Sequence, residues 1–466
     1  MITSPAFAGK HYAVLGLARS GAAAVASLLA GGARVTAWDA REEPRAALAD
    51  AHADVADRLA FADPCAIDLA GFAAVVVSPG VPINRHPIGD AARAADVPLI
   101  CDIELFAQAR GSLPAHKVVG ITGTNGKSTT TALIAHLLDC AGIPALMGGN
   151  IGLPILGQAP LPDGGVHVLE LSSYQIDLTQ RLDCDVALLL NITPDHLDRY
   201  DGFEGYVEAK TRLFGMQAIG HLAVVEMKAE MELDVLRHAP DGQPFTFIEG
   251  VDLPGDQADW PSLSGPHNRA NAQAAVATVR HLGVGEAAIE AGLRSFRGLP
   301  HRMERVGEAN GVLFINDSKA TNPASTAPAL AAFPPVAGHR RIHWILGGLP
   351  KGDDLDECAP FFGNVAAAYT IGDAGPRFAE ILEPHVPVTR SEMMAAALNQ
   401  AIAAALPGDV VLLSPACASF DQFRDYEARG ECFGQLVAAM TGPAAPQPPE
   451  QSSAQPGAQP GGGEPV

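Results

Sequence analysis

Short runs of β-branched and other apolar residues alternate along the chain with longer stretches in which apolar positions recur at helical spacing. Turns that contain Gly or Asp separate the two kinds of segment. This alternation predicts an α/β protein with parallel sheets. The expected strands are 12–15, 34–38 and 75–77 in a first block, 117–122, 166–169 and 186–190 in a second, and 312–315, 343–346, 367–371 and 410–413 in a third.

The chain has 466 residues, and a typical size of ~150 residues per domain suggests three domains. We place them at residues 1–105, 106–300 and 301–441. We expect a Rossmann-like N-terminal domain, a central P-loop ATPase-like domain with a mostly parallel sheet, and a Rossmann-like C-terminal domain. Residues 442–466 are mainly Pro, Gly, Gln, Ser and Ala, so we expect a disordered tail that buries no core.

Charge and cysteine usage narrow the function classes. Lys and Arg number 31 against 52 Asp and Glu, a net charge of -21, which argues against a nucleic-acid partner. No apolar run approaches the ~20 residues of a membrane span. The seven cysteines are scattered without a CxxC pair, which favours a reducing compartment over a disulfide framework or a zinc ribbon. No basic segment precedes the apolar stretch 21–30, so we expect a cytoplasmic protein without a signal peptide.

The strongest motif is the run GITGTNGKST at residues 120–129, in which a buried strand leads into a glycine turn and a helix. Such a turn lets backbone N–H groups and a helix N-terminus surround phosphate. The strict P-loop pattern would place a glycine at Ile121, so this is a variant. Lys127 would bridge the β- and γ-phosphates of ATP, and Ser128 would reach Mg²⁺. The predicted nucleotide-binding residues of the loop are Gly123, Thr124, Asn125, Gly126, Lys127, Ser128 and Thr129.

Three downstream residues are candidates for the same site. Glu170 ends the strand at 166–169, at the sheet edge where ligands bind, so it can meet a metal held by the P-loop. His196 follows the next strand, although imidazole is not a favoured Mg²⁺ ligand and a histidine here can be structural. Lys210 lies on an expected helix and, taken alone, has the pattern of a solvated cation.

The first block contains a second glycine turn. The run AVLGLARSG at 13–21 is similar to G-x-G-x-x-G, but Ala18 replaces the middle glycine, which weakens an NAD interpretation. Asp39 ends the second strand, where a ribose-binding acid belongs. A uridine diphosphate presents the same nucleoside and pyrophosphate, so the residues alone leave NAD and a UDP-sugar both open.

Three polar loops follow predicted strands of the third block, at 316–323, 347–353 and 414–423. Lys319 and Lys351 in these loops would suit the carboxylates of a small dicarboxylic amino acid. They can also be solvated loop lysines.

The strings GTNGKST, ELSSYQ, the N-x-T-x-D-H-L-D run and EAK resemble the central domain of the Mur ligases. These are ATP-dependent, amide-forming enzymes of peptidoglycan precursor synthesis, related to folylpolyglutamate synthases. The resemblance implies that Ser128 and Glu170 hold one Mg²⁺ with the ATP phosphates, that His196 helps to hold a second, and that Lys210 matches a carbamylated lysine. Further residues implied in ATP binding are Asn271, Arg302 and Asp317.

The resemblance extends to the outer blocks. In the first it favours a UDP-sugar over NAD, and the implied substrate residues are Leu17, Ala18, Arg19, Asp39, Ser78 and Gly80, with Asn150 and Ser172 from the second block. The third block resembles the D-glutamate-adding members and lacks the Asp-Asn-Pro-Arg motif of the diaminopimelate-adding ones. The implied residues are Asp317 and Lys319 on the ATP side and Thr321, Lys351 and Ser419 around D-glutamate. Tyr426 stands where an aromatic residue, often Phe, is expected.

The resemblance therefore implies a catalytic set of Lys127, His196, Lys210 and Lys319, with two Mg²⁺ ions. ATP would phosphorylate the terminal carboxylate of UDP-N-acetylmuramoyl-L-alanine, and D-glutamate would displace the phosphate. We expect a monomer with hinge motion near Leu105 and Pro300. The alternatives are another Mur or folylpolyglutamate-type ligase, an NAD-dependent oxidoreductase, and a nucleotide-gated binding protein without chemistry.

Overall fold

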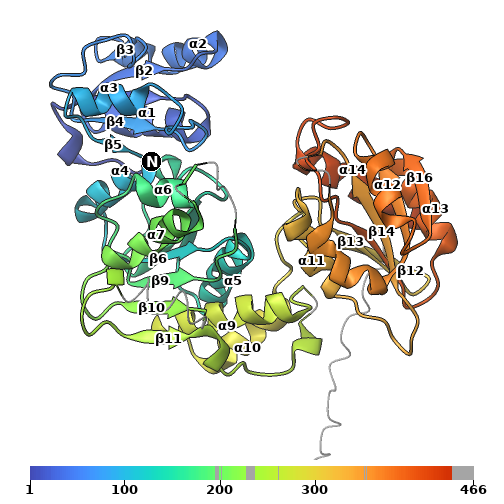
Figure 1. The fold of residues 1–466 in the computed structure, drawn as a ribbon. Helices are drawn as coiled ribbons and strands as arrows, with labels where there is room; N and C mark the ends of the chain where they lie inside the picture. Colours follow the sequence, from blue (N-terminus) through green and yellow to red (C-terminus); the bar gives the residue numbers. More distant parts are fainter. Residues whose placement is uncertain are drawn as a thin grey trace, which may run out of the picture.

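The computed structural model describes residues 1–194, 199–200, 202–226, 237–260, 262–350, 352 and 354–442. Three separate sheets divide the described chain into three α/β domains (Figure 1). The predicted fold class is therefore confirmed, and every strand expected from the sequence is present within a few residues.

The N-terminal domain is a five-stranded parallel sheet in the order β3-β2-β1-β4-β5. Its elements are β1 (His11–Leu15), α1 (Arg19–Ala30), β2 (Arg34–Trp38), α2 (Glu42–Ala51), β3 (Leu59–Phe61), β4 (Ala74–Val77), α3 (Ile88–Ala94) and β5 (Leu99–Ile100). The strand order reverses between β1 and β4. Ligands of doubly wound sheets bind in the crevice beyond the carboxyl ends of the strands at such a point.

The central domain has a six-stranded parallel sheet in the order β11-β10-β9-β6-β8-β7. Its elements are β6 (His116–Thr122), α5 (Lys127–Cys140), β7 (Ala145–Gly149), β8 (Gly165–Glu170), α6 (Ser173–Asp177), β9 (Val186–Leu189), α7 (Gly202–Gly215), β10 (Leu222–Val225), β11 (Phe245–Phe247), α9 (Pro266–His281) and α10 (Glu286–Ser295). Strand β6 lies between β8 and β9, so the loops that leave these three strands meet at one edge.

The C-terminal domain has the strand order β12-β13-β17-β14-β15-β16, in which only the β12–β13 pair is antiparallel. Its elements are β12 (Glu304–Ala309), β13 (Val312–Asn316), α11 (Pro323–Ala331), β14 (Ile342–Gly347), the 3₁₀ helix η7 (Asp356–Asn364), β15 (Val365–Ile371), α12 (Gly375–Leu382), β16 (Val388–Glu392), α13 (Met394–Ala404), β17 (Val410–Leu413) and α14 (Tyr426–Thr441).

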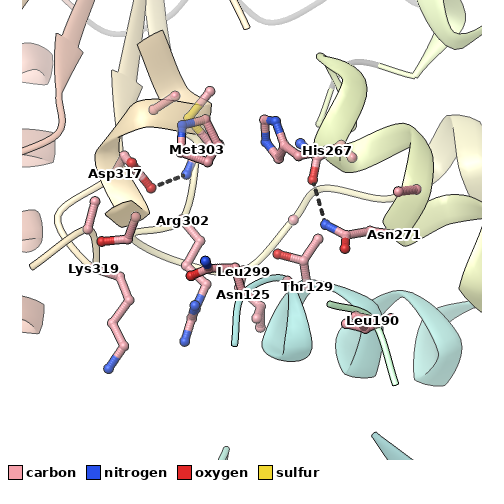
Figure 2. A pocket seen from close by; sticks show the side chains of 18 of the residues that line it. Asn125, Thr129, Leu190, His267, Asn271, Leu299, Arg302, Met303, Asp317 and Lys319 are labelled. Carbon is pink, nitrogen blue, oxygen red and sulfur yellow. Dashed lines mark hydrogen bonds between the residues drawn. The ribbon is translucent and has the colours of Figure 1, made fainter. Parts of the chain in front are cut away.

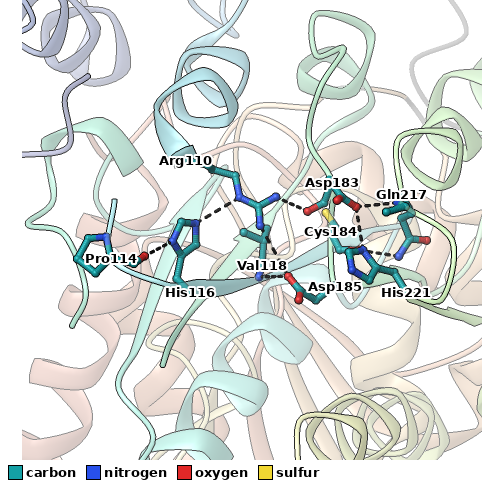
Figure 3. Close-up of polar contacts among 10 residues, drawn as sticks. Arg110, Pro114, His116, Val118, Asp183, Cys184, Asp185, Gln217 and His221 are labelled. Carbon is teal, nitrogen blue, oxygen red and sulfur yellow. Dashed lines mark hydrogen bonds and ion pairs between the residues drawn. The ribbon is translucent and has the colours of Figure 1, made fainter. Parts of the chain in front are cut away.

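Helix α4 (Asp102–Ala109) connects the first two sheets, and the boundary predicted at Leu105 lies inside this helix rather than in a loop. The Glu104 carboxylate accepts the backbone N–H groups of Gln180 (2.8 Å) and Arg181 (3.1 Å) of the central domain. Just beyond the helix, Arg110 reaches the base of the central sheet (Figure 3). The connection between the first two sheets is therefore held by hydrogen bonds to the central domain.

The apolar cores follow the same division. One continuous cluster runs from the N-terminal sheet through α4 into the central domain, from Ile2 to Val225. The C-terminal domain has two clusters of its own, one on each face of its sheet. Among the helices in the described part of the chain, none combines the length and the apolar composition that a membrane crossing requires.

Candidate active site

The glycine turn predicted to bind phosphate connects β6 to α5. Gly123 (φ 148°) and Gly126 (φ 81°) both adopt backbone conformations that disfavour a side chain. A Cβ atom on Gly126 would lie 2.3 Å from Oδ1 of Asn271, which α9 places against the turn. Asn271, predicted to bind ATP, is buried, and its amide donates to Oδ1 of Asn268 at 3.1 Å. The turn and α9 therefore form one packed unit.

Two lysine ammonium groups converge on this turn. Lys127 Nζ donates to the carbonyls of Gly123 (2.8 Å) and Thr124 (2.7 Å). Lys210 Nζ, from α7, donates to the same Gly123 carbonyl at 3.0 Å and lies 4.6 Å from the centre of the Tyr206 ring. Lys210 is only 2% exposed, which excludes its interpretation as a solvated cation. Lysine is rarely buried without a specific role or partner.

Ser128 and Glu170 face each other, as the sequence predicts. The Ser128 hydroxyl donates to Oε2 of Glu170, and Asn150 Nδ2 donates to Oε1 at 3.1 Å. Ser128 and Glu170 are 3% and 2% exposed, so the carboxylate is held in place by two side chains in a buried position. Hydroxyl and carboxylate oxygens are the ligands that Mg²⁺ prefers. The described residues contain no group of three His, Cys, Asp or Glu side chains arranged as a metal site.

The predicted uridine-nucleotide residues lie at the switch point between β1 and β4. Asp39 Oδ2 accepts the Leu17 N–H at 2.9 Å, and the Ser78 hydroxyl donates to the Gly16 carbonyl at 2.7 Å. Ala18 is the N-cap of α1, and Arg19 is its first residue. The exposed positions of this group are Ala18, Arg19 and Gly80. The glycine turn is therefore tied to the ends of β2 and β4 while its surface stays open.

A cavity of about 250 Å³ lies between the central and C-terminal domains (Figure 2). The predicted ATP-binding residues in its lining are Asn125, Gly126, Thr129, Asn271, Arg302 and Asp317, and Lys319 lines it as well. Burial raises the pKa of Asp317 to about 7, although the Ser414 hydroxyl (2.8 Å) and the Met303 N–H (3.2 Å) both donate to its carboxylate. The structure thus brings residues 125–129 together with the segment that starts the third domain.

Lys319 and Tyr426 of the third domain are adjacent. The Lys319 Nζ lies 3.9 Å from the centre of the Tyr426 ring, and burial raises the pKa of the Tyr426 phenol to about 12, so the ring is neutral. Ser419 is buried at the start of the turn that leads toward α14, and Thr321 precedes α11. His196 and Lys351 lie outside the described residues.

Ser172 has a structural task that we did not predict, although the S-x-x-Q spacing of residues 172–175 is the sequence signature of a capping box. Its hydroxyl is the N-cap of α6: it accepts the Gln175 N–H at 3.2 Å, and the Gln175 side chain accepts the Ser172 N–H in return. A capping box of this kind holds the first turn of a helix. The substrate-binding role of Ser172 stays a prediction, as do the roles of the other site residues.

Two further side chains organise the site and were not predicted. Asn191, just beyond β9, pairs with the backbone of Asn125. Arg429, which is 1% exposed on α14, donates to the carbonyls of Ser318 (2.9 Å), Cys417 (3.0 Å) and Ala418 (3.1 Å) and so ties two of the predicted amino-acid loops together. Burial lowers the pKa of Arg429 to about 10. Neither residue type carries a local sequence signal for such contacts.

This arrangement suits the joining of two anions. The first turn of α5 offers N–H groups without intrahelical partners, and the two ammonium groups add positive charge. A hydroxyl and a buried carboxylate stand beside them, and the cavity opens toward the loops of the third domain.

Comparison with known proteins agrees with this geometry. Residues 10–101 match the MurD-like N-terminal domain of Mur ligases, residues 121–241 the Mur ligase middle domain, and residues 301–417 the glutamate ligase domain of Mur ligases. The chain is similar in fold to the crystal structure of the MurF ligase from Thermotoga maritima in complex with ADP, with a TM-score of 0.58 at 16% identity, covering 93% of this chain and 96% of that one.

Two relatives share most of the sequence, and both carry the name UDP-N-acetylmuramoylalanine–D-glutamate ligase. The one from Novosphingobium aromaticivorans is 66% identical over 443 residues, covering 94% of this chain and 97% of the relative. The one from Sphingopyxis alaskensis is 60% identical over 440 residues, covering 94% of this chain and all of the relative. With matches in all three domains, the chain belongs to the Mur ligase family.

Proposed function

We propose that the protein is an ATP-dependent ligase that joins D-glutamate to UDP-N-acetylmuramoyl-L-alanine in peptidoglycan precursor synthesis, through an acyl phosphate. The observation that carries this proposal is the buried pair formed by Ser128, beside Lys127 at the start of α5, and Glu170 at the end of β8. The turn before α5 lines the cavity between the central and third domains. The names of the relatives support the particular substrates. We also propose that the protein binds Mg²⁺, is a monomer and is located in the cytoplasm.

In the first step, a carboxylate oxygen of the UDP-substrate attacks the γ-phosphorus of ATP, and ADP leaves. Both reactants are anions, so their approach requires neutralising charge. Lys127 and the N-terminus of α5 supply part of it. Ser128 and Glu170 would hold Mg²⁺, which neutralises phosphate charge when bound. Arg302, at the edge of the same cavity, would stabilise the charge that develops on the transferred phosphoryl group.

In the second step, the amine of D-glutamate attacks the acyl carbon, phosphate leaves, and the amine releases a proton. The loops that carry Lys319, Thr321 and Ser419 would bind the two carboxylates of the amino acid, with Lys351 from a position outside the described residues. Arg429 supports this assignment, because it fixes the 318 and 417–418 segments relative to each other.

The uridine nucleotide would bind at the N-terminal switch point, with Asp39 and Ser78 shaping the turn that meets its pyrophosphate. Ala18, Arg19 and Gly80 form the exposed rim, and Leu17 is buried beneath it. Asn150 and Ser172 would contact the sugar and the acyl end, since both lie beside Glu170 or its following turn. The three domains would then each supply one reactant.

Substitution of Lys127 tests the proposal directly. We expect Lys127→Ala to abolish ADP formation, whereas Lys117→Ala, at the opposite end of β6 and exposed, should leave the rate unchanged. Phosphate release with a panel of D- and L-amino acids should be largest with D-glutamate. Near-normal turnover of Lys127→Ala would refute the phosphate-loop assignment, and a different preferred amino acid would place the chain elsewhere in the family.

Lys210 provides a second test. Addition of CO₂ to its amine would turn an ammonium into an anionic oxygen ligand beside the phosphate turn. We expect Lys210→Ala to be nearly inactive and to regain part of its rate with a small carboxylic acid such as acetate. A normal rate without acetate would remove Lys210 from the site.

A further inference from the structure

Asn191 lies where the pairing between β6 and β9 runs out. The ladder of these parallel strands ends at Thr122 and Leu189, and the Leu190 N–H then donates to the Thr122 carbonyl at 3.1 Å. Asn191 is the next residue along, directly opposite the phosphate turn. Asn191 can therefore continue the pairing with the β6 side of the sheet beyond the last regular strand residues.

Asn191 continues the pairing with both its backbone and its side chain. Its carbonyl accepts the Thr124 N–H at 2.9 Å. Its Oδ1 accepts the Asn125 N–H at 2.8 Å, and its Nδ2 donates to the Asn125 carbonyl at 3.0 Å. The side-chain amide therefore takes the place of a further peptide unit. Two residues on, the Thr193 N–H donates to the Thr124 hydroxyl at 3.0 Å.

We propose that Asn191 is a positioning residue that holds the phosphate turn in the shape that receives the triphosphate. This inference rests on the proposed function, because it takes ATP as the ligand of the turn. The N–H groups of Thr124 and Asn125 are already bonded to Asn191. The donors left to meet phosphate are those of the first turn of α5, which lack intrahelical partners. Asn191 thereby directs the anion toward Lys127 and Ser128.

The asparagine side chain meets this geometry because its amide offers one acceptor and one donor. Aspartate is nearly the same size, but it would set an anionic oxygen against the Asn125 carbonyl in place of a donor. Alanine removes both bonds and adds no charge. We expect Asn191→Asp and Asn191→Ala each to raise the Kd for ADP with Mg²⁺ about tenfold or more, because a turn that is no longer held must be ordered when the nucleotide binds.

Thr193→Ala is the matched control. Thr193 contacts the turn through its backbone N–H and carbonyl, so loss of its exposed side chain should leave the Kd for ADP unchanged. Calorimetric titration of the full chain with ADP and Mg²⁺, and separately with UDP, measures the two nucleotide sites in the same samples. The Kd for UDP should be the same in all of these proteins, since its site lies in the N-terminal domain.

Wild-type affinity for ADP in both Asn191 variants would overturn the proposal. Parallel loss of ADP and UDP binding would also overturn it, because that result shows a general loss of structure rather than a displaced turn. A different result would contradict the proposed function itself. In that case the wild-type protein would bind ADP no more tightly than Lys127→Ala does.

Discussion

The two junctions between the domains are built differently. At the first, residues 100–116, the chain crosses as helix α4, whose first five residues are buried. Cys101 and Leu105 are fully buried, and the apolar cluster continues across the junction. Arg110 donates to Nε2 of His116 at 3.2 Å and to the Asp183 carbonyl, and it lies 3.7 Å from Oδ2 of Asp185 (Figure 3).

At the second junction, residues 296–304, the chain crosses as an irregular segment beside the cavity. His301 (φ 62°) and Met303 (φ 47°) adopt the left-handed conformation that favours glycine. Such residues each hold on the order of 1 kcal/mol of strain or more, and they persist where the surroundings fix them. Among the residues that the structure describes, the cores of the third domain do not continue into the central domain.

This difference indicates which part of the molecule can move. The N-terminal and central domains share one core, so their separation would expose apolar surface. Reorientation of the third domain needs backbone rotation in residues 296–304 and a change in the contacts around the cavity, such as that between Gly265 and Ala332. We therefore expect motion at the predicted hinge near Pro300 and little at Leu105. First-junction variants should alter stability, and second-junction variants should alter the reaction.

The largest effect is expected at Arg302. We expect Arg302→Ala to lower kcat about 100-fold or more, because a cation that stabilises developing phosphoryl charge is lost. The urea unfolding midpoint should stay within error. The matched control is Arg297→Ala, an exposed arginine of the same segment. If Arg302→Ala were destabilised and retained its kcat, the second junction would be structural like the first.

Arg110→Met should lower the stability of the protein and leave its kcat unchanged, the opposite of what we expect for Arg302→Ala. Loss of Arg110 leaves the Asp183 carbonyl, His116 and Asp185 without their shared donor, and we expect the free energy of unfolding to fall by about 2 kcal/mol. The kcat at 25 °C should not change. Arg93→Met is the control, because Arg93 pairs with Asp90 on the exposed surface and such pairs contribute little. Loss of turnover without loss of stability would contradict the division between the junctions.

The third prediction concerns Asp102, a buried carboxyl at the first junction, and its effect depends on pH. Burial raises its pKa from 3.8 to about 6, so the folded protein binds this proton more tightly than the unfolded chain does. The group's contribution to stability is therefore greatest below pH 4, falls as the pH rises to about 6, and is constant above that. We expect Asp102→Asn to be more stable than the wild type by about 3 kcal/mol at pH 8, because a shift of about two pKa units corresponds to that free energy, and nearly equal to it near pH 4. Urea unfolding at the two pH values measures this. An unchanged difference between them would show that the charge of Asp102 is not involved.

The strands that the sequence predicted lie mostly inside the sheets. In the N-terminal domain β1, β2 and β4 were predicted, whereas the two edge strands β3 and β5 were not. The same holds for the edge strands of the other sheets, β7, β11, β12 and β16. Interior strands of parallel sheets are buried on both faces and have continuous apolar runs, whereas edge strands such as β12 are half-exposed and polar. The interior strand β10 was missed as well.

The sequence by itself determined the features that depend on neighbouring residues: the alternation of strands and helices, and the glycine turn that leads into Lys127 and Ser128. It placed Glu170 at the carboxyl end of a strand. Because that strand, β8, pairs with β6 in the sheet, the carboxylate lies beside Ser128. Tertiary structure alone decided that Lys210 is buried, that Asn191 completes the phosphate turn, and that Arg429 joins two loops. These contacts join residues that are far apart along the chain, so their energies depend on how the sheets and helices pack rather than on local pattern. For the same reason, only the folded chain distinguishes a rigid first junction from a cavity-lined second one.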